Sequence, residues 1–276
     1  MGTLEAIALA IIQGLTEFLP VSSSGHLALA HWLFGLGGEE SELPLEFVVL
    51  VHLGTLLAVV VYYRRDLAEI LRDLFAPRRA AADGEEPGWG RRLLVLLVVA
   101  TLPAGLGIML GDLVERLLNT PWAVGCALLV TGVALLLGER VGRRTKAAGD
   151  TTPRDALLVG VAQLFAITPG ISRSGSTIAA GLAVGFRREW AARFAFLMSV
   201  PAILAGSALE AKDLVEQGAG GALGLYVLCG LIAAATGYGA IRLVIRAVQS
   251  RNLRWFAAWC FLVGLLAIVA NLSGLA

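Results

Sequence analysis

The chain has 276 residues, of which 57% are hydrophobic, and its mean hydropathy is +0.78. Both values exceed those of soluble globular domains, so the sequence indicates an integral membrane protein. The 22 lysine and arginine residues nearly balance the 21 aspartate and glutamate residues, which excludes the strongly basic surface expected of a protein that binds nucleic acid.

The first apolar region, residues 4–36, is too long for one spanning helix and is interrupted near its middle. As a single helix it would be about 50 Å long, whereas the hydrocarbon core of a bilayer is about 30 Å thick. Pro20, three serines and Gly25 mark the interruption, because proline cannot continue a helix. We expect two short helices that form a re-entrant hairpin.

Three apolar stretches follow, each long enough to cross a bilayer at about 1.5 Å per residue. They are residues 45–63, 92–111 and 121–138. The loop between the first two mixes charged and apolar side chains, which predicts a short amphipathic helix on the cytoplasmic surface.

The second half of the chain has the same order of elements. Residues 155–185 form another interrupted apolar region, in which Pro169 and Gly170 precede a serine-rich turn. Each arm reaches only about 20 Å, so a second re-entrant hairpin is expected. Three further spanning helices are expected at residues 190–209, 221–241 and 254–272.

The two interrupted regions align with each other when Gln13 is placed on Gln163. The aligned pairs are Ser22 with Ser172, Ser23 with Arg173, Ser24 with Ser174, Gly25 with Gly175 and His26 with Ser176. One membrane domain, residues 1–276, is therefore expected, with repeats at approximately 1–138 and 150–276. Since three crossings change sides, the predicted fold is an all-α membrane protein with six transmembrane helices plus two re-entrant helical hairpins in an inverted-topology repeat.

The basic residues give this topology an orientation. Nineteen of the 22 lysines and arginines fall on the side of the membrane opposite the two termini. Because cytoplasmic loops carry the excess of positive charge, both termini are expected outside the cytoplasm.

Ionisable side chains at membrane depth are costly and usually functional, which singles out Glu17, His26 and Arg173 at the two interruptions. Free N–H groups at the start of each second arm can hold an anion, and the guanidinium of Arg173 matches phosphate oxygens. Glu17 can act as a base or bind a divalent cation, and His26 can pass a proton. The sequence leaves three candidates for the attacking group, namely Ser23, His26 and a water activated by Glu17.

Other polar residues have plainer interpretations. His52 lies within an apolar span with no motif around it, so it is expected to be structural. Serine is also common at helix breaks in membranes because its hydroxyl satisfies free backbone groups.

Two segments resemble motifs of a known family. The segment from Gln13 to His26, QGLTEFLPVSSSGH, looks like the (E/Q)xxxE motif of the undecaprenyl-diphosphate phosphatases with its serine-rich turn and histidine. The segment from Pro169 to Thr177, PGISRSGST, is similar to their PGxSRSxxT motif. The resemblance covers essentially the whole chain, although Gln13 stands where some relatives have a second glutamate.

This resemblance implies an enzyme of the bacterial inner membrane that removes the terminal phosphate of undecaprenyl diphosphate at a site facing the periplasm. Mg²⁺ or Ca²⁺ is the implied cofactor, with Glu17 as its ligand, and a homodimer is a further expectation. The expected catalytic residues are Glu17, Ser23, His26 and Arg173. The expected substrate-binding residues are Gln13, Ser22, Ser24, Ser172, Ser174 and Thr177.

The alternative is a transporter or flippase of a phosphorylated lipid or anion. Inverted repeats with broken helices near the midplane are common in transporters, and fold alone does not separate the two functions.

Overall fold

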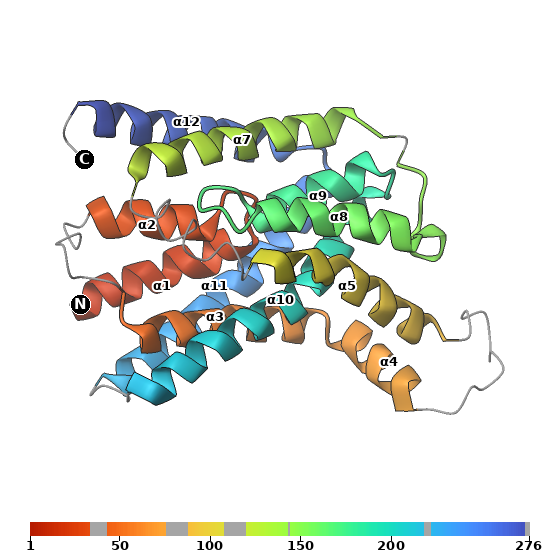
Figure 1. The fold of residues 1–276 in the computed structure, drawn as a ribbon, viewed down its shortest axis with the longest axis horizontal. Helices are drawn as coiled ribbons and strands as arrows, with labels where there is room; N and C mark the ends of the chain where they lie inside the picture. The colour runs from red at the N-terminus through yellow and green to blue at the C-terminus, as the bar shows by residue number, and fades with distance from the viewer. Residues whose placement is uncertain (34–42, 76–87, 108–119, 143, 218–221, 274–276) are drawn as a thin grey trace.

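The computed structural model describes residues 1–33, 43–75, 88–107, 120–142, 144–217 and 222–273, which are helical apart from their connections and one isolated β-bridge between Lys146 and Phe186. The helices of the described chain are α1 (Thr3–Phe18), α2 (Ser23–Leu33), α3 (Leu45–Tyr62), α4 (Arg64–Phe75), α5 (Trp89–Gly105), α7 (Pro121–Arg140), α8 (Pro153–Phe165), α9 (Arg173–Ala183), α10 (Arg188–Gln217), α11 (Leu223–Gln249) and α12 (Leu253–Leu272) (Figure 1).

Five helices of the described chain are long and apolar enough to cross a membrane, namely α3, α7, α10, α11 and α12. They match five of the six predicted spans. The sixth prediction, residues 92–111, corresponds to α5 as far as Gly105, and residues 108–111 lie outside the described part of the chain. The structure is therefore that of a multi-pass α-helical membrane protein.

Both interrupted regions are broken at the predicted positions. The helix α1 ends at Phe18 and α2 begins at Ser23, while α8 ends at Phe165 and α9 begins at Arg173. Ser22 has a φ of +73° and Gly170 a φ of +92°, so each break turns through the left-handed region of backbone space. For Ser22 this conformation is unusual, and such backbone strain is most often found at functional sites.

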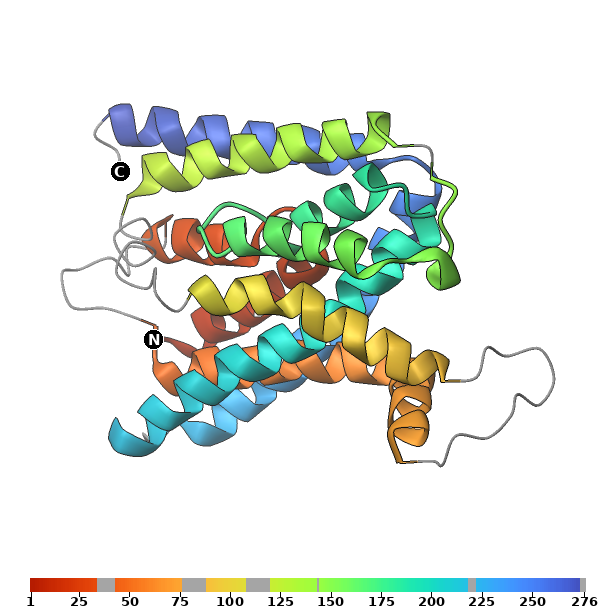
Figure 2. The same ribbon diagram turned by 45° about the vertical axis from the view of Figure 1, so that its right-hand side comes forward.

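The helices pack in layers around the two breaks. The helices α7 and α12 lie side by side along one edge of the molecule in both views, and α3 packs against α11 on the far side (Figures 1 and 2). Between these layers lie α1, α2, α8 and α9. The α3–α11 crossing depends on close backbone approach, since a Cβ atom on Gly54 would lie 2.0 Å from the carbonyl oxygen of Gly230.

The polar helix ends gather at one end of the molecule. In Figure 1, α4, the C-terminal end of α7 and the N-terminal end of α8 lie at the right, opposite the N-terminus and the end of α12. The helix α4 matches the predicted amphipathic helix: Arg193 Nε donates to Asp66 Oδ1 at 2.6 Å on one face, while Leu71, Leu74 and Phe75 are exposed on another.

Asp155 holds the segment before α8 in place. Its Oδ1 accepts from Lys146 Nζ at 2.6 Å, and its Oδ2 accepts from the backbone N–H and the hydroxyl of Thr152 at 3.0 and 2.8 Å. The Thr152 hydroxyl accepts in return from the Asp155 N–H at 3.2 Å, which completes a capping box. Burial raises the pKa of Asp155, but the hydrogen bonds from Lys146 and Thr152 outweigh it, and the net pKa is lowered.

We expect Asp155→Asn to lower the free energy of unfolding by roughly 1 to 3 kcal/mol, because it weakens a cap and removes a buried partner of Lys146. Since the native pKa is lowered, this stabilisation is complete above the ordinary pKa of aspartate and is lost as the pH falls below it. Thermal unfolding in detergent at several pH values tests this. Arg154→Gln, at an exposed neighbour, is the control, and equal melting temperatures for the two variants would contradict the prediction.

Candidate active site

The two helix breaks are joined to each other by hydrogen bonds. Ser22 Oγ accepts from the N–H of Gly170 at 3.1 Å, and Ser174 Oγ donates to the carbonyl oxygen of Leu19 at 3.0 Å. A Cβ atom on Gly170 would lie 2.5 Å from the carbonyl oxygen of Val124, so glycine is required where the second break approaches α7. The serine-rich turns, 150 residues apart in the sequence alignment, therefore form one structural unit.

The start of each second arm repeats the same hydrogen bonds. Ser172 Oγ accepts from the N–H of Gly175 at 3.1 Å and lies 3.2 Å from Ser174 Oγ. At the aligned positions, Ser22 Oγ accepts from the N–H of Gly25 at 3.3 Å and lies 3.4 Å from the hydroxyl oxygen of Ser24. Two equivalent helix N-termini thus face the region between the breaks, and such termini attract anions.

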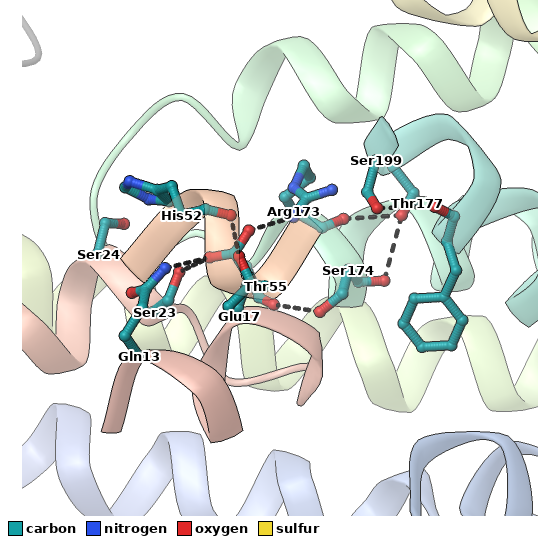
Figure 3. Close-up of polar contacts among 12 residues, drawn as sticks. Gln13, Glu17, Ser23, Ser24, His52, Thr55, Arg173, Ser174, Thr177 and Ser199 are labelled. Atoms are coloured by element: carbon teal, nitrogen blue, oxygen red, sulfur yellow. Dashed lines mark hydrogen bonds and ion pairs between the residues drawn. The ribbon is translucent and has the colours of Figure 1, made fainter. Parts of the chain in front are cut away.

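Glu17 lies at the centre of the polar contacts (Figure 3). Its Oε2 accepts from Gln13 Nε2 at 3.0 Å and from Ser23 Oγ at 2.6 Å, and its Oε1 forms an ion pair with the Arg173 guanidinium. The Glu17 side chain is 7% exposed and that of Arg173 is 19% exposed. The two breaks therefore bring the predicted base, hydroxyl and guanidinium into direct contact.

Arg173 is fixed at the first residue of α9. The hydroxyl of Thr177 donates to the Arg173 carbonyl oxygen at 2.8 Å, and the serine cap at Ser172 orders the turn before it. Its positive charge thus adds to the positive end of the helix. An anion that reaches this point would compete with Glu17 for the guanidinium.

His26 is directed elsewhere. Its Nε2 lies 2.9 Å from Trp259 Nε1, and its Nδ1 lies 2.8 Å from the carbonyl oxygen of Ser22. Because an indole N–H only donates and a carbonyl only accepts, we assign the neutral tautomer with the proton on Nδ1. Both ring nitrogens are then occupied, and neither bonds Glu17, Ser23 or Arg173 in the described chain.

The remaining predicted residues line the unit in different ways. Ser22, Ser172, Ser174 and Thr177 are buried and hydrogen bonded within it, whereas Ser24 is exposed at its edge. The Gln13 side chain is fully buried, and its Oε1 has no hydrogen-bond partner in the described structure.

His52 was expected from the sequence to be structural, but the structure places it beside the site. It lies on α3 beside the polar cluster, and its imidazole interacts electrostatically with Glu17 (Figure 3). One signal was available in the sequence, since an ionisable side chain in a membrane span is by default a functional candidate.

The site does not fit a cation held by Glu17 in this state. Both Glu17 oxygens accept from protein donors, and a metal ion at either would have to displace Arg173 or the Gln13 and Ser23 groups. Within the described residues, no group of three or more His, Cys, Asp and Glu side chains could hold a metal ion.

Comparison with known proteins identifies the relatives of this chain. The family described as bacitracin resistance protein BacA matches residues 6–266. An undecaprenyl-diphosphatase of Rubrobacter xylanophilus is 42% identical over 271 residues, which are 98% of this chain and 97% of the relative. Proteins of the same name from Salinibacter ruber and Carboxydothermus hydrogenoformans are 42% and 38% identical, covering 94% and 99% of this chain and 96% and 99% of their own lengths.

Proposed function

The chain belongs to the bacitracin resistance protein BacA family, and from this membership and the geometry of the site we propose that it hydrolyses undecaprenyl diphosphate to undecaprenyl phosphate and inorganic phosphate. The observation that carries the proposal is the contact of Glu17 with both Ser23 and Arg173 across the two helix breaks. It combines a hydroxyl, its proton acceptor and a phosphate-binding cation. The names of the relatives favour this function over transport.

The ion pair suggests how substrate binding activates the site. The pyrophosphate group competes with Glu17 for the Arg173 guanidinium, which binds phosphate oxygens as a fork. Once Arg173 turns to the phosphate, Glu17 loses its neutralising partner and becomes the stronger base. Substrate binding thereby prepares the carboxylate that already accepts a hydrogen bond from Ser23.

The reaction then proceeds through Ser23. Its oxygen forms a bond to the terminal phosphorus while its proton passes to Glu17, and the bridging oxygen departs with its electron pair as the lipid monophosphate. Water attacks the resulting phosphoserine, and Glu17 returns the proton to the serine oxygen as the phosphorus–oxygen bond breaks. Arg173 and the two helix N-termini stabilise the charge on the transferring group.

The packing supports an inverted repeat with six spans and two re-entrant hairpins. Exchange of the two halves pairs α1 with α8, α2 with α9, α3 with α10, α5 with α11 and α7 with α12. Several of the contacts respect this exchange: α7 packs on α12 and α3 on α10, the α1–α11 contact is matched by α8–α5, and the α3–α11 contact by α10–α5. Matched contacts of this kind are expected where two halves are related by a two-fold axis.

We place the protein in the inner membrane with α4 at the cytoplasmic face and both termini in the periplasm. The support is the clustering of α4 and the basic ends of α7 and α8 at the end of the molecule opposite the N-terminus. The site would open toward the periplasm. A homodimer and a catalytic role for His26 stay predictions.

The proposed cation, Mg²⁺ or Ca²⁺, would arrive with the pyrophosphate, whose charge it neutralises. We therefore expect neither ion to raise the melting temperature of the protein alone by more than about 1 °C, because no ligand cluster awaits it. Chelation should nevertheless abolish phosphate release. Thermal scans with and without the ions test this, and a clear stabilisation of the substrate-free protein would indicate a protein-bound metal and favour Glu17 as its ligand.

The function is tested with purified protein in detergent, where no compartments exist. The protein should release inorganic phosphate from a polyprenyl diphosphate when Mg²⁺ or Ca²⁺ is present. A transporter would release none, and that result would reject the proposed function.

A further inference from the structure

His52 and Glu210 form a pair beside the site. The Nδ1 atom of His52 lies 3.0 Å from the carbonyl oxygen of Val48 and 3.6 Å from Glu210 Oε2. The carbonyl can only accept, so we assign the proton to Nδ1. That leaves the lone pair of Nε2, which has no hydrogen-bond partner within the described structure.

Glu210 is aimed at this imidazole. It lies on α10, which packs on α3, and its Oε2 is buried with no hydrogen-bond partner in the described chain. A buried carboxylate oxygen is costly without a partner, and an imidazole that gains a proton at Nε2 would place a positive charge beside it. A carboxylate behind Nδ1 with Nε2 free is the arrangement that orients and charges a catalytic imidazole.

The three ionisable side chains differ in exposure. The Glu17 side chain is 7% exposed, that of His52 is 27% exposed and that of Glu210 is 32% exposed. His52 interacts electrostatically with Glu17 on α1 and with Glu210 on α10. A proton received by His52 is therefore stabilised by carboxylates on two sides.

The proposed reaction needs such a group in its second step. After Ser23 attacks, Glu17 carries the serine proton, which it must return to the serine oxygen. It cannot also accept a proton from the attacking water. Both ring nitrogens of His26 are held by Trp259 and Ser22, whereas the imidazole of His52 interacts electrostatically with Glu17 and keeps Nε2 free within the described structure.

We propose that His52 is the general base that activates this water and that Glu210 is its positioning residue, an inference that rests on the proposed function. The water oxygen forms a bond to the phosphorus of phosphoserine 23 while its proton passes to Nε2 of His52. The bond between phosphorus and the serine oxygen breaks, and that oxygen takes the proton held by Glu17. His52 then releases its proton to solvent, so no further reactant is needed.

The test uses polyprenyl diphosphate labelled with ³²P in its terminal phosphate and the full-length protein in detergent. His52→Gln should lower kcat about 10²-fold, as expected for loss of a general base, and should lower KM with it, because kcat/KM depends only on the first step. Because only the second step is slowed, ³²P-labelled protein should accumulate. Glu210→Gln should show the same accumulation with a decrease of about 10-fold, and His31→Gln should behave as the wild type.

The outcomes separate the two hypotheses. Wild-type protein that releases no phosphate rejects the proposed function, and this inference with it. If the wild type is active, His52→Gln within about threefold of it rejects the inference alone, as does slow turnover without labelled protein. If His52→Gln does not fold, Glu210→Gln decides, because label must accumulate in it. Label that persists when Ser23 is also replaced by alanine counts against the proposal.

Discussion

Arg173→Ala should lower kcat at least about 10²-fold, because the transferring phosphoryl group loses its main cationic partner. Arg173→Lys should recover only part of this loss, since an ammonium keeps the charge but cannot bind two phosphate oxygens as a fork. Phosphate release at saturating substrate measures both effects. The exposed Arg65→Ala serves as the control, and an Arg173→Ala enzyme with near wild-type kcat would remove this residue from phosphoryl transfer.

The Glu17–Arg173 pair allows catalysis and stability to be distinguished. Arg173→Ala leaves a carboxylate that is 7% exposed without its partner, so the melting temperature should fall as well. Glu17→Ala should also lose at least about 10²-fold in kcat. The variant that carries both Glu17→Ala and Arg173→Ala should be more stable than Arg173→Ala alone, because no unpaired charge remains. It should recover none of the activity.

The helix breaks and the hydroxyl contacts around them follow closely from local sequence. Pro20 and the serine at each helix start act within a few residues, through a missing donor and a side-chain cap. The alignment of Ser22 with Ser172 therefore predicts hydrogen bonds that both turns make to their own backbone.

The lengths of the helices are predicted less closely by the sequence. Hydropathy predicts spans at 190–209 and 221–241, whereas α10 runs over Arg188–Gln217 and α11 over Leu223–Gln249. The apolar pattern marks the part of a helix that suits lipid. Backbone hydrogen bonding continues into polar ends, where the pattern gives no signal.

The partners of the two histidines depend on distant packing. His26 lies next to the motif serines in sequence, yet its ring meets Trp259 of α12. His52 lies in an unmarked span, yet the contacts of α3 with α1 and α10 bring it to the site. No local pattern specifies which faces of two helices meet. Proximity in sequence therefore favoured His26, whereas it is His52 that interacts electrostatically with Glu17.

Ser23→Ala should lower kcat at least about 10³-fold, because it removes the attacking oxygen from an enzyme that uses covalent catalysis. The Ser23 hydroxyl is 2.6 Å from Glu17 Oε2, the distance of a hydroxyl already donating to its base. No ³²P-labelled protein should form in this variant under any condition. Substrate affinity should change little, since Arg173 and the helix N-termini are kept.

The size of the loss distinguishes Ser23 from a water as the attacking group. If water attacks directly, Ser23 only holds the Glu17 carboxylate in place, and its loss removes one hydrogen bond, which corresponds to about 10-fold in rate. Single-turnover phosphate release by Ser23→Ala, beside Ser250→Ala at the exposed α11–α12 turn, measures the difference. A loss near 10-fold would assign the attack to water and the serine to orienting Glu17, whereas a loss near 10³-fold requires that the serine oxygen itself reach phosphorus.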